Sequence, residues 1–289
     1  MKAQYCPSEI IERNRAATVF ITAKGTLKQT GAVETRTGSG FVISRSGYVL
    51  TNRHVVESDV KVEDIEIVGS IGSRNAASSE LTVIARNEHD VALLKFADTS
   101  KTYSSAVLGK PSDVKVGSEL CSEGFPKGQE WFFSEGAMSG TGGERGFWLT
   151  QMPSNEGDSG APVFLSSGEV VAIKVGGYED LQNVNLVIPM NLAGDLLTKV
   201  PDLPDFSISH GSSEMIVRGK IVPPQKGKQA KILVDGEASE AVADEYGRFE
   251  IKVHKKSNQS ARFLVWVDGK QVCNQLQSLS GEVTLFLRQ

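Results

Sequence analysis

Cysteine is scarce in this sequence, and its spacing predicts no crosslink. Only Cys6, Cys121 and Cys273 occur among the 289 residues. They lie far apart, are odd in number and include no C-x-x-C pair. The spacing therefore predicts neither a disulfide framework nor a metal site.

The sequence also lacks targeting and membrane signals. Residues 1–15 carry charges and no apolar core of the kind that secretory signals need. No apolar run approaches the roughly 20 residues of a membrane-spanning helix. These absences predict a cytoplasmic protein without a membrane partner.

Neither sign of charge is in large excess. Lys and Arg total 31 against 35 Asp and Glu, which gives a net charge of −4 at pH 7. Nucleic acid is therefore not an expected partner. With 39% hydrophobic residues the chain can build a core, and its length of 289 residues suggests two domains or one large all-β unit.

What the sequence does contain is a serine between glycines, in Gly157-Asp158-Ser159-Gly160. A serine hydroxyl is a poor nucleophile at neutral pH, so it needs a base beside it and donors for the oxyanion. Flanking glycines permit a tight turn in which the amides of Gly157 and Ser159 could hold that oxyanion. The same residues also suit an ordinary turn between two strands.

A histidine and an aspartate precede this serine in suitable contexts. His54 follows the apolar segment YVLTNR, and Asp90 opens the apolar strand VALLKF. The order histidine, aspartate, serine is that of the chymotrypsin-type triad. His54 would act as general base and Asp90 would orient it. His89 is expected to be a bystander, because neighbours along a strand point to opposite faces.

Five segments together resemble a known family. In order they are GSGFVIS, YVLTNRHVV, HDVALLKF, GFPKG and GDSGAPVF. They are similar to trypsin-like serine proteases, especially the bacterial HtrA/Deg and glutamyl-endopeptidase branch, over roughly residues 10 to 200. The resemblance implies an all-β fold of two six-stranded β-barrels and an endopeptidase without cofactor or metal. Val55 stands where digestive trypsins carry a cysteine, which fits a reducing compartment.

The resemblance also assigns a substrate site. Pro153 and Ser154 would line the specificity pocket, and Pro153 replaces the acidic base of the trypsin pocket. Val175, Gly176 and Gly177 would pair with the substrate backbone as an added strand.

Lys174 interrupts the apolar strand VVAIKVGG just before that segment. It could bind an acidic substrate side chain as an ion pair, or it could extend to solvent.

Asp158 is the second charged residue with open alternatives. The HtrA branch usually has asparagine at this place, whereas trypsin zymogens use the aspartate to bind a freshly cut N-terminus. No matching activation sequence is visible in this chain. Asp158 could therefore pair with an internal cation or remain solvated, and activation by N-terminal cleavage is a weaker alternative.

A second pattern begins after the protease-like region 1–200. Residues 201–213 are expected to form a linker that starts with Pro201-Asp202-Leu203-Pro204. Residues 214–289 contain alternating strands spaced as in a small β-sandwich, and they resemble carboxypeptidase-regulatory or transthyretin-like modules. This accessory domain is expected to bind a regulatory protein partner.

The sequence thus favours a serine endopeptidase that acts on protein or peptide substrates, with a possible preference for acidic residues. One alternative is a protease held inactive until its C-terminal domain senses a signal. Another is a non-catalytic binding protein built on a protease scaffold. Chaperone activity is a weaker third possibility.

Overall fold

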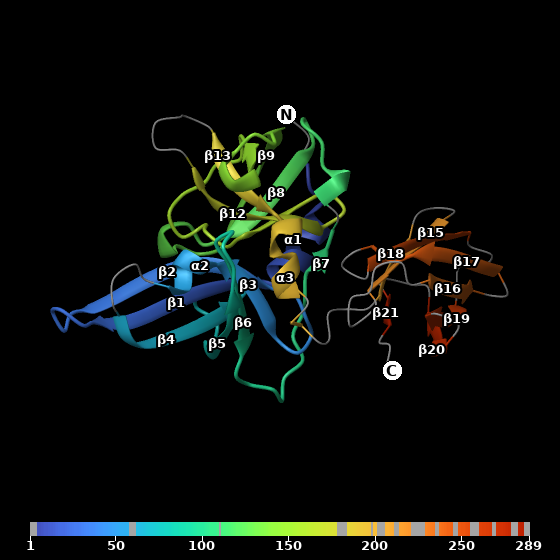
Figure 1. The fold of residues 1–289 in the computed structure, drawn as a ribbon, viewed down its shortest axis with the longest axis horizontal. Helices are drawn as coiled ribbons and strands as arrows, with labels where there is room; N and C mark the ends of the chain where they lie inside the picture. The colour runs from blue at the N-terminus through green and yellow to red at the C-terminus, as the bar shows by residue number, and fades with distance from the viewer. Residues whose placement is uncertain are drawn as a thin grey trace. The chain divides into compact units, whose positions relative to one another are not determined.

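The chain folds into two compact units, Met1–Leu197 and Thr198–Gln289 (Figure 1). The computed structural model describes residues 5–57, 62–109, 111–177, 184–197 and 199–200, together with the strands of the second unit. The described residues of that unit are 206–210, 214–220, 229–234, 237–244, 248–254, 260–267, 270–278 and 283–285.

The first unit opens with helix α1 and a closed six-stranded barrel. Helix α1 spans Ser8–Arg15, as its amphipathic sequence predicts. The barrel order is β1-β2-β3-β6-β5-β4. Its strands are β1 Thr18–Leu27, β2 Val33–Val42, β3 Tyr48–Asn52, β4 Val62–Ile71, β5 Ser79–Arg86 and β6 Val91–Phe96.

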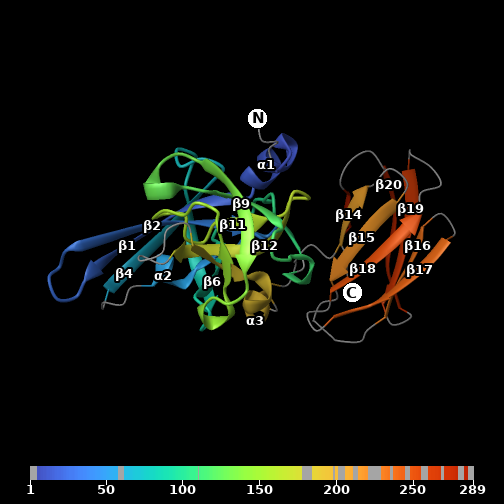
Figure 2. The ribbon, with the colours of Figure 1, turned by 90° about the horizontal axis from the view of Figure 1, so that it is seen from above.

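The polar composition of segment 24–37 predicts a loop, but the segment is mostly strand. Lys24 pairs with Thr35 and Thr26 with Val33, so β1 and β2 continue beyond the barrel as a long ribbon (Figure 2). A ribbon with solvent on both faces needs no apolar alternation, and the sequence pattern therefore did not reveal it.

The second barrel is also closed. Its strands are β8 Glu119–Gly124, β9 Phe132–Gly140, β10 Trp148–Thr150, β11 Pro162–Phe164, β12 Glu169–Gly177 and β13 Asn185–Pro189. They follow the order β11-β8-β9-β10-β13-β12, and pairing of β11 with β12 completes the ring. Strand β7, Val107–Leu108, adds to β12 in parallel. The expected fold of two six-stranded barrels is therefore confirmed.

Alternate residues of the strands fill each barrel with apolar side chains. In the first barrel Val19, Ile21 and Leu50 are fully buried. The second barrel has its own cluster of Leu120, Met138, Trp148, Met152, Val163, Val171, Ala172 and Val187. Burying one such side chain contributes roughly 1.5–3 kcal/mol, so the two cores hold the loops between them in place.

The amphipathic pattern of residues 191–200 predicts a closing helix, and the helix in the structure is shorter. A 3-10 turn, η4, spans Met190–Ala193, and helix α3 spans Gly194–Leu197. Leu196 and Leu197 are buried, so this short segment closes the first unit against the second barrel.

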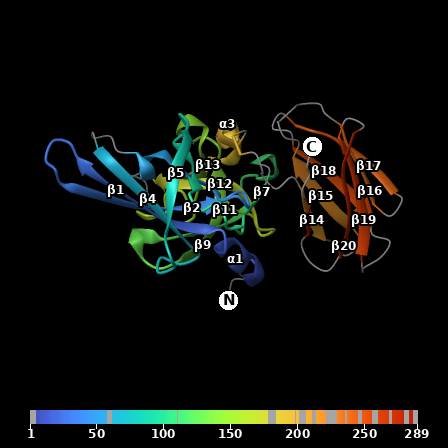
Figure 3. The same ribbon diagram turned by 90° about the horizontal axis from the view of Figure 1, so that it is seen from below.

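The second unit contains two four-stranded antiparallel sheets, drawn as two layers in Figures 2 and 3. One has the order β18-β15-β14-β21, from Arg248–His254, Glu214–Lys220, Phe206–His210 and Val283–Leu285. The other has the order β17-β16-β19-β20, from Glu237–Val242, Gln229–Val234, Ser260–Val267 and Lys270–Ser278. The β-sandwich and its transthyretin-like class stay predictions.

The expected linker 201–213 is not linker throughout. Residues 206–210 form β14, whose alternating Phe206 and Ile208 pair with Gly219 and Val217 of β15. Residues 201–205 and 211–213 lie outside the described residues.

The N-terminal segment is fastened to the second barrel, and this corrects one expectation. Cys6 and Cys121 form a disulfide across 115 residues, with Cα atoms 6.6 Å apart. Asn14 of α1 also donates a hydrogen bond to the carbonyl of Gly168 at 3.1 Å. The expectation of unpaired cysteines was wrong, because sequence spacing does not report which distant segments the fold brings together.

Breaking this disulfide should destabilise the first unit. A crosslink that closes a loop of more than 100 residues restricts the unfolded chain, so reduction or Cys6→Ser should lower the free energy of unfolding by about 4 kcal/mol. Urea unfolding followed by tryptophan fluorescence measures the loss. Cys273→Ser is the control and should respond to reductant as the wild type does. An unchanged midpoint in Cys6→Ser would contradict the prediction.

Beneath α1, a buried carboxylic acid makes stability depend on pH. Glu123 on β8 is fully buried, and its Oε2 accepts hydrogen bonds from the indole of Trp131 at 3.1 Å and the hydroxyl of Thr18 at 3.5 Å. Its Oε1 has no hydrogen-bond partner among the described residues. Loss of solvent raises the pKa of Glu123 to about 8.

Because that pKa lies above its ordinary value of 4.5, the folded protein holds a proton that the unfolded chain releases. Stability should therefore fall as pH rises from about 5 to 8, by at most about 1.4 kcal/mol per pH unit. Urea unfolding at several pH values tests this, with Glu123→Gln as the matched variant. Equal pH slopes in the two proteins would rule out Glu123 as the cause.

Candidate active site

The candidate histidine stands on a short helix that follows β3. Helix α2 spans Arg53–Val56, and one aspartate holds its first turn. The carbonyl of Asp90 accepts from the amide of Arg53 at 2.9 Å. The Asp90 carboxylate accepts from the amide of His54 at 3.0 Å and lies 2.7 Å from its ring Nδ1. This arrangement leaves Nε2 as the ring nitrogen available for other work.

The backbone before β6 gives Asp90 its position. Asp90 has φ +62°, a left-handed conformation that aspartate tolerates better than most residues. The side-chain oxygen of Asn87 accepts from the amides of His89 and Val91, both at 3.1 Å, and thereby forms the turn. Asp90 is mostly buried whereas His54 is about half exposed, at 14% and 47% of their side chains. The pair thus faces solvent from the histidine side.

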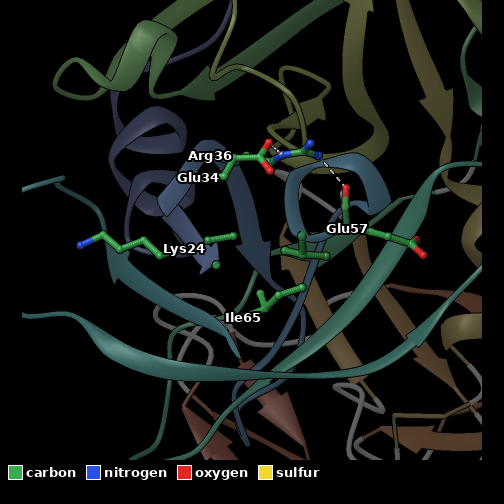
Figure 4. Close-up of a pocket in the computed structure, with 8 residues that line it drawn as sticks. Lys24, Glu34, Arg36, Glu57 and Ile65 are labelled. Carbon is green, nitrogen blue, oxygen red and sulfur yellow. Dashed lines mark hydrogen bonds and ion pairs between the residues drawn. The ribbon is translucent and has the colours of Figure 1, made fainter. Parts of the chain in front are cut away.

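Arg36 is a contributor that the sequence analysis missed. From β2 its guanidinium donates to the carbonyl of His54 at 3.1 Å and to that of Glu57 at 2.7 Å. Glu34, two residues earlier on the same face, pairs with it at 2.8 Å. Figure 4 shows these side chains around a small hollow also lined by Lys24 and Ile65. The i, i+2 pair of opposite charges is a usable signal, but the polar composition of segment 24–37 predicts a loop in which such a pair has no fixed geometry.

The candidate nucleophile lies in a turn that only glycine can form. Gly157 and Gly160 have φ +87° and +88°. A Cβ on Gly160 would approach the carbonyl oxygen of Ser39 to 2.0 Å, and one on Gly157 would approach that of Phe125 to 2.5 Å. The glycines therefore serve close backbone approach as well as the turn.

Ser39 of β2 joins this turn to the first barrel. Its amide donates to the carbonyl of Ser159 at 2.8 Å, and its hydroxyl donates to the carbonyl of Gly157 at 2.7 Å. The same hydroxyl accepts from the amide of Phe125 at 3.0 Å. Beside it, a Cβ on Gly38 would meet both Val55 of the histidine helix and Ser159. The segment Gly38-Ser39-Gly40 thus lies where the two barrels meet.

The hydroxyl of Ser159 does not bond to His54 in this structure. It donates instead to the carbonyl of Val175 at 3.1 Å. Within the described part of the chain, the amides of Gly157 and Ser159 donate no hydrogen bond. Both amides are therefore available to an incoming oxygen.

Lys174 is buried, which excludes the alternative that it extends to solvent. Its side chain is 2% exposed, and its Nζ lies 3.5 Å from Oδ2 of Asp158 and 3.1 Å from the hydroxyl of Ser134. Asp158 is itself only 3% exposed, so it is not solvated. Burial lowers the pKa of Lys174, while the Asp158 carboxylate acts in the opposite direction. Of the alternatives for Asp158, the geometry fits pairing with an internal cation.

The other expected substrate residues border the serine turn. Pro153 is exposed and Ser154 half-buried, and both precede Gly157 in the loop from β10. Val175 and Gly176 are half-buried and Gly177 is exposed at the end of β12. There β12 pairs with β13 on one side only, because its pairing with β11 stops at Ile173. The opposite edge is unpaired by any described strand.

Comparison with known proteins finds similarity over the first unit. Residues 38–173 match the family model of the trypsin-like peptidase domain. A probable periplasmic serine endoprotease, DegP-like, from Hahella chejuensis is 33% identical over 179 residues, which cover 57% of this chain and 36% of that protein. Its counterpart from Halomonas elongata is 34% identical over 187 residues, with 60% and 36% covered. This chain spans about a third of the length of these relatives. The expected likeness to trypsin-like serine endopeptidases of the Deg type is confirmed, whereas the glutamyl-endopeptidase likeness stays a prediction.

These comparisons also correct the expected cytoplasmic location. The relatives carry names that place them in the periplasm. The disulfide between Cys6 and Cys121 also argues against the reducing compartment that Val55 indicates. Among the described helices none is long and apolar enough to cross a membrane.

Proposed function

We propose that this chain is a serine endopeptidase in which Ser159, His54 and Asp90 form the catalytic triad. The observation that carries the proposal is that the Asp90 carboxylate contacts His54 twice, at 2.7 Å from the ring Nδ1 and 3.0 Å from the backbone amide. These two hydrogen bonds fix the orientation of the ring, as a general base requires. The glycine-flanked turn then offers Ser159 from the other barrel.

The chemistry follows from these positions. Ser159 leaves the carbonyl of Val175, and its Oγ attacks the substrate carbonyl while the proton passes to Nε2 of His54. The amides of Gly157 and Ser159 hold the oxyanion. His54 returns the proton to the leaving amine as the peptide C–N bond breaks, which leaves an acyl-enzyme. A water molecule then gives a proton to His54 and attacks the ester; the bond between the acyl carbon and Ser159 Oγ breaks, His54 returns the proton to Oγ, and the acid product leaves.

Protein or peptide chains are the substrates that this site suits. The open edge of β12 at Val175, Gly176 and Gly177 offers backbone groups to an extended segment, and Pro153 with Ser154 borders the adjacent side chain. No cofactor or metal takes part in this mechanism.

A gated protease is a second candidate, favoured by one observation. The Ser159 hydroxyl donates to Val175 rather than to His54, so the serine is in a resting position. A regulatory partner bound by the second unit could control its release. A non-catalytic scaffold is the remaining alternative.

We also propose an oxidising compartment, such as the periplasm of the relatives. Free Cys6 and Cys121 thiols in protein alkylated directly in cells would argue against it.

Fluorophosphonate labelling is the direct test of the proposed triad. The wild type should be labelled, because the reagent requires an activated serine and an oxyanion site, and Ser159→Ala should not be. His54→Ala should be labelled roughly 100-fold more slowly or worse, since it lacks the general base.

A chain ending at residue 205 serves as the comparison for gating. Labelling that appears only in the shortened chain would favour the gated protease. No labelling of either chain would leave the scaffold interpretation.

An acidic preference remains a specific prediction. An acidic substrate side chain would have to compete with Asp158 for Lys174, because the two already lie 3.5 Å apart. If such competition occurs, a peptide library should show enrichment of Glu or Asp before the cleaved bond, and raised salt should weaken it. A profile with no acidic enrichment would reject the preference.

A further inference from the structure

Lys174 contacts the serine turn through its backbone as well as its side chain. Its amide donates to the carbonyl of Ala161 at 2.9 Å, and its carbonyl accepts from the amide of Gly160 at 2.8 Å. The carbonyl of the next residue, Val175, accepts a hydrogen bond from the hydroxyl of Ser159. Strand β12 therefore supports the turn on the side opposite to Ser39.

The side chain of Lys174 reaches the start of the same turn. One oxygen of Asp158, Oδ2, lies 3.5 Å from Nζ and accepts from the amide of Asn155 at 3.0 Å. The amide of Asp158 also donates to the carbonyl of Asn155 at 3.1 Å. The carboxylate of Asp158 thus forms a turn with Asn155 through this hydrogen bond. Lys174 neutralises the charge of that carboxylate.

The charge balance at this point decides whether the turn can persist. Asp158 is 3% exposed and Lys174 is 2% exposed, and an unpaired charge at such depth is strongly unfavourable. Without the ammonium, Asp158 would have to take up a proton or turn toward solvent. Either change would alter the part of the turn that positions the amides of Gly157 and Ser159. Removing both charges together avoids this penalty.

We propose that Lys174 is a positioning residue, an internal counter-ion for Asp158 that holds the turn 155–161 in the shape that catalysis requires. This inference rests on the proposed function of Ser159. In this arrangement the cation comes from strand β12 of the same chain, so the turn needs no newly cut N-terminus. Activity would then require no cleavage of the chain.

Matched variants of the full-length chain separate positioning from simple packing. Lys174→Met keeps the length of the stem and removes the charge, and Lys174→Met/Asp158→Asn removes both charges. Lys115→Met is the control, because Lys115 is an exposed lysine of the second barrel. The measurements are the fluorophosphonate labelling rate, the urea unfolding midpoint, and hydrogen exchange of the amides of Asp158, Gly160 and Ala161.

Lys174→Met should label roughly 100-fold more slowly than wild type, the loss typical of a misplaced catalytic group. The double variant should recover at least roughly tenfold of that loss, since the two residues are coupled. Exchange at the three amides should accelerate in the single variant and return toward wild type in the double variant. Lys115→Met should match wild type throughout.

Three results would overturn the inference. They are wild-type labelling of Lys174→Met, equal defects in the single and double variants, and unchanged exchange at the three amides. Absence of labelling in both the full-length wild type and the chain ending at residue 205 would instead refute the proposed function. The exchange measurement would then decide alone whether Lys174 holds the turn, and urea unfolding identifies a variant that has failed to fold.

Discussion

The site depends on the attachment of the serine turn to the first barrel through Ser39. The residues that hold the histidine, Asp90 and Arg36, belong to the first barrel, whereas Ser159 belongs to the second. Ser39 is fully buried and bonds through its amide to Ser159 and through its hydroxyl to Gly157. A hydrogen bond inside a closely packed region resists displacement, because a buried donor or acceptor without a partner is costly. Ser39 thereby links the turn that carries Ser159 to the barrel that carries His54.

The two halves of the site are held by different kinds of interaction. Asp90 contacts both the amide and the ring of His54, and Arg36 binds the carbonyl of His54, so the candidate base is oriented by several charge-assisted bonds. The serine turn relies on close backbone packing around glycines and on one buried ion pair. The hydroxyl of Ser159, the candidate nucleophile, donates to the carbonyl of Val175. Substrate that pairs with the edge of β12 would approach the group that holds Ser159 at rest.

The two barrels were predicted from the resemblance to a known family, and the candidate triad residues from local sequence patterns. The segments around His54, Asp90 and Ser159 carry their signals within a few neighbouring residues, and alternating apolar positions predicted most strands. Longer-range pairing was not predictable in this way. Arg36 and Ser39 act through strand register between segments more than 15 residues apart. Lys174 and Asp158 were each recognised as unusual charges, but only the fold brings β12 beside the turn. The pairing of Cys6 with Cys121, which are 115 residues apart, was not predictable from the sequence for the same reason.

The disulfide also affects what happens to a chain that is cut. Cys6 lies near the start of the chain and Cys121 is on β8, so both products of a single cleavage between them remain covalently joined. Such a protein would migrate as one molecule until it is reduced. The barrel that carries His54 lies almost wholly within that loop. A nicked molecule could therefore keep its first barrel attached to the second, and internal cleavage by a neighbouring molecule would not by itself release either half.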